Sequence, residues 1–246
     1  MTDIILGMGE VGSTIFEILT ERGFDCIGID IDRTKEKKVE SLNKNPQFLH
    51  VCLSGELDEF ENTVLNQIKK NQDLQAVIIH STVKPGTTKS IQNKIKTPVF
   101  YSPVRGVHKR FLEDVKRYTK FIACDFEIDE NIKSEIENRF KKIQWMSSTK
   151  TAEFAKILVD TTYYGWLINY AQLTKMICDK EEVNFDEMWK FSDEIHEFLG
   201  NRPKMFPGII GGHCVIPNLN LIDYEELKRI SNVNELFKKF KERSEI

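Results

Sequence analysis

The sequence predicts an α/β protein, with a doubly wound parallel sheet over residues 1–148 and an all-helical domain over residues 149–246. Three observations support this prediction. Apolar strand-like runs alternate with helical stretches through the first half, which is typical of a parallel sheet covered by helices. A glycine-rich turn joins the first strand to the first helix. From about residue 149 the alternation ends and helical patterns replace it.

Six short apolar runs in the first half are expected to form the strands. Helices are expected to fill the intervals, for instance Val11–Arg22 and Phe60–Lys70. The expected strands are Asp3–Leu6, Asp25–Ile29, Phe48–Leu53, Ala76–His80, Val99–Tyr101 and Phe121–Cys124.

The second half contains three helical patterns. Thr151 to Asp179 has no proline and one glycine, so we expect it to form a single long helix. Asp186–Leu199 and Asp223–Lys241 are expected to form two more helices. The domain boundary at residue 148 rests on this change of period alone.

Composition indicates an ordinary soluble globular protein, with 40% hydrophobic and 30% charged residues. The net charge of −3 and the lack of a basic excess in either half argue against nucleic acid as a partner. No apolar stretch approaches the roughly 20 residues needed to cross a bilayer, and no signal peptide is recognisable. Five scattered cysteines favour reduced thiols over disulfides or a metal site. We therefore expect a cytoplasmic protein without a membrane partner.

The turn Gly7–Gly12 reads G-M-G-E-V-G and lies between the first strand and the first helix. In a Rossmann domain the first glycine makes the tight turn, and the second lets a pyrophosphate approach the backbone. The third lets helix and strand pack closely, while the helix N-terminus stabilises the phosphate charge. The alternative is a glycine turn that merely packs a helix.

Asp30 ends the second strand, where a carboxylate is expected to bind the hydroxyl groups of the adenosine ribose. Its charge would repel a 2′-phosphate, so the sequence predicts NAD as the cofactor in preference to NADP. Arg33 and Lys35 lie near enough to weaken this preference.

Four later segments resemble segments of a known family. His80–Thr88 is similar to an S-T-V-x-P-G-T-T loop, and Ser102–Arg105 is similar to an S-P-E-R segment. Ala152–Lys156 resembles an A-E-x-x-K at the start of a long central helix, and Gly211–Cys214 matches a G-G-H-C loop. These are motifs of the UDP-glucose/GDP-mannose dehydrogenase family, the nucleotide-sugar 6-dehydrogenases. The resemblance covers nearly the whole chain, and the family's third, nucleotide-binding domain is expected to be absent.

The resemblance implies oxidation of a sugar C6 alcohol to a carboxylate with two NAD. An aldehyde donates a hydride only after a nucleophile adds to it, and a cysteine thiolate supplies that addition. Cys214 is the implied nucleophile. Lys156 would stabilise the developing oxyanion, and Thr82 would hold the hydrolytic water or the nicotinamide side of the cleft.

The expected site residues fall into three groups, and none is a metal ligand. The expected catalytic residues are Cys214, Lys156, Asp160, Asn218 and Thr82. The expected cofactor-binding residues are Gly7, Met8, Gly9, Glu10, Val11, Gly12, Asp30, Ser54, Ser81 and Thr82. The expected substrate-binding residues are Arg105, Glu153, Gly211, Gly212 and His213.

The sequence also departs from the family pattern. Val104 replaces a glutamate, Asp160 replaces an asparagine and Asn218 replaces an aspartate. The last two changes exchange a carboxylate and an amide, so a cluster of Lys156, Asp160 and Asn218 would retain one of each. These departures leave two alternatives open. One is a two-electron β-hydroxyacid-type dehydrogenase that needs Lys156 but not Cys214, and the other is an inactive NAD-binding protein.

The long helix carries an apolar face that a chain of this size would bury with difficulty. In the resembling family the equivalent helix forms a dimer interface, so the resemblance implies a homodimer. The apolar residues concerned are Leu158, Trp166, Leu167, Leu173 and Ile177.

Overall fold

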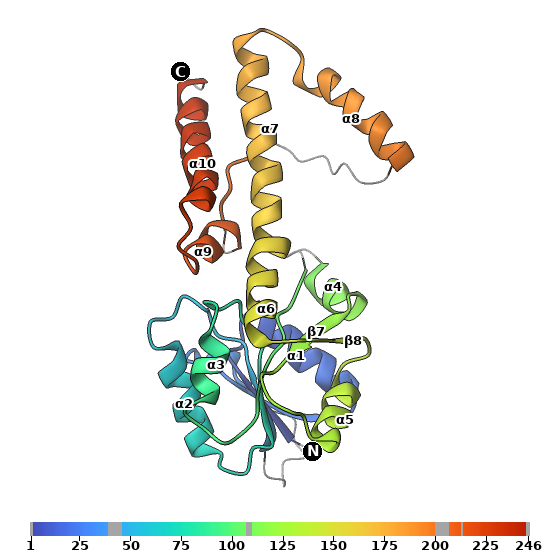
Figure 1. Ribbon diagram of the computed structural model, residues 1–246, viewed down its shortest axis with the longest axis vertical. Coiled ribbons are helices and arrows are strands. Elements are labelled where there is room, and N and C mark those ends of the chain that lie inside the picture. Colours follow the sequence, from blue (N-terminus) through green and yellow to red (C-terminus); the bar gives the residue numbers. More distant parts are fainter. Residues whose placement is uncertain (1, 39–45, 107–109, 200–206, 213, 245–246) are drawn as a thin grey trace. The chain divides into compact units, whose positions relative to one another are not determined.

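The computed structural model describes residues 2–38, 46–106, 110–199, 207–212 and 214–244 of the chain (Figure 1). The chain divides into two compact units, Met1–Lys156 and Ile157–Ile246. The first unit is an α/β sandwich and the second is helical, as the fold class predicted.

An eight-stranded sheet forms the centre of the first unit, with the order β3-β2-β1-β4-β5-β6-β7-β8 in the described part of the chain. Chain order reverses beside β1, which pairs in parallel with both β2 and β4. Ligands of doubly wound folds bind where the order reverses. The strands are β1 Thr2–Leu6, β2 Asp25–Ile29, β3 Lys37–Lys38, β4 Pro46–Val51, β5 Ala76–Ile79, β6 Val99–Tyr101, β7 Lys120–Ala123 and β8 Ile143–Met146.

The six expected strands are all present, with ends that differ by up to two residues. Two further strands, β3 and β8, were not expected. β3 is a pair of exposed lysines that runs antiparallel to β2. β8 has four residues, none of them fully buried, and a glutamine interrupts its apolar residues.

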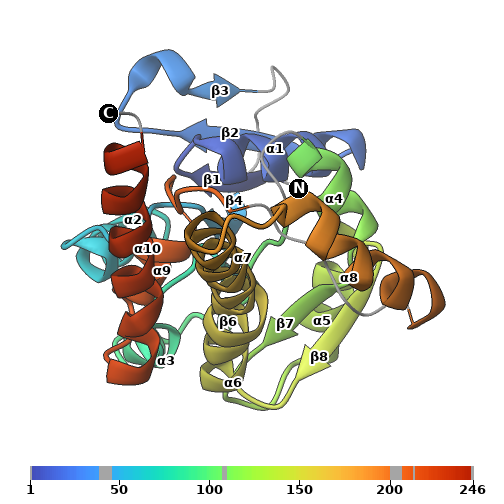
Figure 2. The ribbon, with the colours of Figure 1, turned by 90° about the horizontal axis from the view of Figure 1, so that it is seen from above.

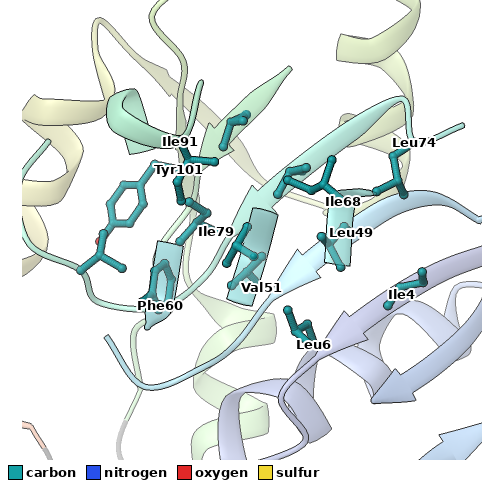
Figure 3. Close-up of a cluster of buried hydrophobic side chains, with 14 of the residues drawn as sticks. Ile4, Leu6, Leu49, Val51, Phe60, Ile68, Leu74, Ile79, Ile91 and Tyr101 are labelled. Carbon is teal, nitrogen blue, oxygen red and sulfur yellow. The ribbon is translucent and has the colours of Figure 1, made fainter. Parts of the chain in front are cut away.

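Helices cover both faces of the sheet, because successive side chains of each strand point to opposite sides. Ile4 and Leu6 of β1 join one apolar cluster, while Ile5 joins the other. Figure 3 shows part of the first cluster, in which Phe60 and Ile68 pack against Leu49 and Val51. Figure 2 shows α2 and α3 on one side of the sheet and α1, α4 and α5 on the other. The helices of this unit are α1 Glu10–Glu21, α2 Phe60–Lys70, α3 Thr87–Gln92, α4 Phe111–Arg117, α5 Glu130–Arg139 and α6 Thr149–Phe154, with a 3₁₀ turn at Arg33–Lys35.

The expected long helix is present but not uniform. The chain is helical without a break from Thr149 to Lys180, and the segment Ala155–Thr162 within it is π-helical. The hydroxyl of Thr162 donates to the carbonyl of Ile157, five residues earlier. Wide turns of this kind are frequent at functional sites, and this one contains the expected site residue Asp160.

The second unit is a small helical assembly in which α10 packs along α7 (Figures 1 and 2). Ile210, Leu219 and Ile230 form its buried cluster. No helix in the described ranges is both long and apolar enough to cross a membrane. The helices of this unit are α7 Tyr163–Lys180, α8 Phe185–Leu199, α9 Val215–Leu219 and α10 Glu225–Ser244.

Candidate functional site

The glycine turn has the geometry that dinucleotide binding requires. Gly7 has φ +91°, a conformation that favours glycine. A Cβ at Gly12 would lie 1.7 Å from the Gly7 carbonyl oxygen, so only glycine lets α1 start this close to β1. A Cβ at Gly9 would meet no described atom within 4 Å. The turn is therefore closed at its packing positions and open at the position that a pyrophosphate must approach.

Asp30 is already oriented toward this turn. Its Oδ2 accepts a hydrogen bond from the backbone N–H of Met8 at 2.6 Å, and its Oδ1 accepts from the N–H of Asp32 at 2.9 Å. The carboxylate thus links the end of β2 to the glycine turn. Of the remaining expected cofactor residues here, Glu10 is exposed and Val11 is half-buried.

The loops after β4 and β5 adjoin one another at the carboxyl edge of the sheet. Ser81 is buried and donates to the carbonyl of Val51 at 3.4 Å. Ser54 is exposed and accepts from the N–H of Glu56. A Cβ at Gly55 would lie 1.8 Å from the carbonyl oxygen of Thr82, so the two loops are in backbone contact. The three expected cofactor residues Ser54, Ser81 and Thr82 are brought together at this edge.

Glu153, expected to bind substrate, is fully buried and bonded within the chain. Its Oε2 accepts from the N–H of Gly86 at 2.6 Å. Its Oε1 accepts from the N–H and the hydroxyl of Thr88 at 3.0 and 2.7 Å. Burial raises the pKa of this carboxyl in spite of the hydrogen bonds. The contacts give Glu153 a structural role, in which it links α6 to the start of α3.

Arg105 contacts residues at and just before the start of β7. Its guanidinium donates to the carbonyl of Thr119 at 2.9 Å and lies over the rings of Tyr118 and Phe121, 5.3 and 4.9 Å from their centres. Val104, which stands at the position of the family glutamate, is buried in an apolar cluster. It supplies no proton-transfer group.

A chain of buried polar groups crosses the sheet. Arg139 donates to both carboxylate oxygens of Asp3, at 2.8 and 2.9 Å. Asp3 Oδ2 lies 3.3 Å from His50 Nε2, and His50 Nδ1 lies 2.9 Å from His80 Nε2. His80 Nδ1 lies 3.1 Å from the Nζ of Lys120. Sequence analysis missed this chain, although His50 and Asp3 stand out as ionisable residues within apolar strand runs.

Burial sets the charge states along this chain. It lowers the pKa of both histidines below the ordinary value, so their rings are neutral at pH 7. Burial also lowers the pKa of Lys120 to about 7, and the positive charges of Lys156 and Arg105 act in the same direction.

In the helical unit, Cys214 is exposed and directly precedes α9. Gly211 and Gly212 before it are also exposed, and Gly212 has φ +72°. His213 lies outside the described residues. The other four cysteines are buried, and the five thiols are all free. Within the described ranges there is no cluster of three potential metal ligands.

Side-chain amides hold the segment that leads to Cys214. The amide of Asn234 both accepts from the N–H of Ile210, at 2.7 Å, and donates to its carbonyl, at 3.0 Å. Gln172 donates to the carbonyl of Gly208 at 2.7 Å and to Asn234 at 3.2 Å. The approach to the cysteine loop is thus fixed from α7 and α10. Asn169 and Gln172 are the buried amide side chains of α7.

The expected cluster of Lys156, Asp160 and Asn218 would join two residues of the π-helical segment to one of α9. Asn218 donates to the hydroxyl of Thr161 at 3.3 Å, which places α9 beside the π-helical segment that carries Asp160. Lys156 belongs to the first unit and the other two to the second. The three-residue cluster stays a prediction.

Comparison with known proteins finds similarity to dehydrogenases of nucleotide sugars. The chain is 26% identical to a UDP-N-acetyl-D-mannosamine dehydrogenase of Methanocaldococcus jannaschii and 24% identical to one of Methanococcus maripaludis. Each match covers 86% of this chain and 58% of the relative, so the chain spans less than two thirds of these relatives. No family model matches the chain.

Solved structures share the fold. A UDP-D-ManNAc dehydrogenase from Pyrococcus horikoshii superposes with a TM-score of 0.79 at 20% identity, over 98% of this chain and 69% of that one. A UDP-glucose dehydrogenase from Pyrobaculum islandicum gives a TM-score of 0.75 at 16% identity, over 96% of this chain and 68% of that one.

Proposed function

We propose that this chain, a relative of the nucleotide-sugar dehydrogenases, binds NAD and oxidises the C6 alcohol of a nucleotide sugar to a carboxylate. The curated relatives are named for UDP-N-acetyl-D-mannosamine, which makes that compound the first substrate to test. The observation that carries the proposal is the glycine turn, which is open at Gly9, packed at Gly12 and linked to the Asp30 carboxylate. The β-hydroxyacid and inactive alternatives are not favoured by these relatives.

The residues of the first unit fit NAD. The Gly7–Gly12 turn would hold the pyrophosphate, and Asp30 would accept hydrogen bonds from the adenosine ribose while repelling a 2′-phosphate. Ser81 and Thr82 would lie on the nicotinamide side. When bound, NAD supplies the hydride acceptor for each of the two oxidations.

The remaining chemistry belongs to the chain's own residues. The Cys214 thiolate adds to the aldehyde carbon and forms a thiohemiacetal. Lys156 donates to the oxygen on which negative charge develops, and Asp160 and Asn218 orient the lysine and the hydrolytic water. After the second oxidation, water hydrolyses the thioester, releases the carboxylate and regenerates the thiol. The exposure of Cys214 and the amide contacts that hold residues 208–210 support this assignment.

Stoichiometry tests the proposed function. We expect two NADH per UDP-N-acetyl-D-mannosamine consumed, measured by absorbance of the reduced cofactor at completion. Cys214→Ala is expected to abolish carboxylate formation, lowering its rate by about 10³-fold or more, because the aldehyde then lacks its nucleophile. The variant should bind NAD as the wild type does, which calorimetry checks. One NADH per sugar, or an unchanged rate in Cys214→Ala, would contradict the four-electron mechanism.

We also propose that the chain is a cytoplasmic homodimer that pairs through α7. Trp166, Leu173 and Ile177 of this helix are 41%, 40% and 60% exposed, and Leu158 on the preceding turn is 38% exposed. An apolar face of this extent is typical of a protein interface. Sedimentation is expected to show a dimer at micromolar concentration, and Ile177→Arg is expected to shift it toward monomer. A monomeric wild type would refute the pairing.

A further inference from the structure

The direction of β7 brings its first residue to the ligand-binding edge of the sheet. β5 and β6 are parallel, so both end at the same edge. β7 runs antiparallel to β6, with Ala123 opposite Tyr101, so β7 begins where β6 ends. Lys120 is the first residue of β7 and is only 6% exposed. Its side chain therefore lies among the loops that follow β5 and β6.

In its protonated form Lys120 has three N–H donors, and the structure gives each one an acceptor. Nζ donates to the carbonyl oxygens of Ser102 and Pro103 at 2.6 and 3.2 Å. It also lies 3.1 Å from His80 Nδ1. Ser102 and Pro103 follow β6 directly, and His80 follows β5 directly. One buried cation thus fixes the starts of two neighbouring loops.

The buried chain behind Lys120 fixes the His80 ring as well. His80 Nδ1 lies 2.9 Å from the carbonyl oxygen of Ser102, and both are acceptors when the ring nitrogen is unprotonated. The ammonium lies between them and supplies the donors. With Lys120 protonated, the His80 ring carries its proton on Nε2 and donates a hydrogen bond to His50 Nδ1, and His50 Nε2 donates in turn to Asp3. All the donors point from Lys120 toward Asp3, which Arg139 holds from the other side.

We infer that Lys120 is a positioning residue that sets the nicotinamide and sugar half of the site through the loops beginning at His80 and Ser102. These loops contain Ser81, Thr82 and Arg105, whereas the Gly7–Gly12 turn follows β1 and Asp30 follows β2. The residues on either side of Lys120 contact Arg105: Thr119 accepts its hydrogen bond, and Phe121 packs its ring against the guanidinium. This inference rests on the proposed function, because the proposed function places these loops beside the nicotinamide of NAD and the sugar of the substrate.

A comparison of NAD with ADP-ribose distinguishes this positioning role from a general effect on folding. ADP-ribose carries the adenosine and pyrophosphate of NAD but lacks the nicotinamide. In calorimetry, Lys120→Met is expected to bind ADP-ribose within about twofold of the wild type and NAD about tenfold more weakly. The tenfold loss corresponds to one charge-assisted hydrogen bond, here from Lys120 to the loop carbonyls. Lys142→Met, at an exposed lysine of the same unit, is the matched control and should change neither affinity.

The possible outcomes separate the two ideas. Equal weakening of both ligands, or no weakening of either, would overturn the inference while leaving NAD binding intact. Binding of neither ligand to the wild type would instead refute the proposed function.

A second measurement uses the wild type alone, so that it decides the question even where Lys120→Met does not fold. ¹⁵N NMR of the histidine rings, recorded below the Lys120 pKa of about 7, is expected to show His80 protonated on Nε2 and unprotonated on Nδ1. Saturating NAD should shift these His80 resonances, whereas ADP-ribose should leave them in place. A His80 ring protonated on Nδ1, or one that NAD does not perturb, would overturn the inference.

Discussion

Gly12→Ala is expected to abolish NAD binding and to lower the free energy of unfolding by about 3 kcal/mol. The new Cβ would lie 1.7 Å from the Gly7 carbonyl oxygen and 2.8 Å from the Gly7 carbonyl carbon. Both atoms belong to the backbone, so the clash is relieved only by moving α1 away from β1. That movement takes the turn amides out of reach of the pyrophosphate. Urea unfolding and calorimetry with NAD measure the two effects.

Gly9→Ala is the matched control, because it places the same methyl group in open space. Gly9 has φ −67°, which alanine adopts without strain, and no described atom lies within 4 Å of the added Cβ. Stability should stay within about 0.5 kcal/mol of the wild type. NAD affinity should nevertheless fall, since the methyl group occupies the space of the pyrophosphate. Wild-type stability in Gly12→Ala would show that the turn is not packed as described.

Arg139→Met is expected to cost about 3–5 kcal/mol of the free energy of unfolding, as for a buried ion pair that loses one partner. Arg139 and Asp3 are both fully buried. The guanidinium also lies over the rings of Phe24 and Phe48, 4.5 and 3.7 Å from their centres. Methionine retains part of the packing but leaves the Asp3 carboxylate without its cation. Denaturant unfolding at pH 7 measures the loss.

Two comparisons identify the cause of that loss. Lys94→Met removes a cation from the half-exposed pair with Glu61 and should cost less than about 1 kcal/mol. Adding Asp3→Asn to Arg139→Met removes the unpaired charge and should recover part of the stability. If Arg139→Met costs no more than Lys94→Met, the buried pair does not contribute as described.

The pH dependence of stability provides a further check on the same variant. Burial raises the pKa of the Asp3 carboxyl, but hydrogen bonds from His50 and Arg139 outweigh burial and leave the pKa below its usual value. A carboxyl with a lowered pKa in the folded state stabilises the fold above its unfolded pKa near 3.8, and this contribution is lost as the pH falls. Arg139→Met should weaken this acid dependence.

Local pattern was sufficient to predict most of the first unit. The strand Asp25–Ile29 was predicted to the residue, and the glycine turn has the expected geometry, because both depend on neighbours in the sequence. The same holds for Asp30, whose position at the end of β2 determines what it can reach. β8 was missed although three of its four residues are apolar, because Gln144 interrupts the run and the pairing with β7 cannot be read from the sequence.

The polar interior could not be predicted in the same way. Asp3 and Arg139 are 136 residues apart, and no period connects them. A histidine in an apolar strand indicates burial, but its partner depends on the strand order and on which face it shares. Glu153 shows the same limit, because its partners Gly86 and Thr88 lie at the start of α3, more than 60 residues earlier. The π-helical turn also escaped prediction, since Ala155–Thr162 fits an ordinary helix by propensity.

The distribution of thiols makes the wild-type chain selective toward alkylating reagents. Cys214 is exposed, whereas burial raises the pKa of Cys26 and Cys52 to about 12 and keeps both protonated at neutral pH. Cys124 and Cys178 are shielded as well. A maleimide fluorophore will therefore label the proposed nucleophile without any cysteine being removed, and protection of that label site by added ligands reports occupancy directly.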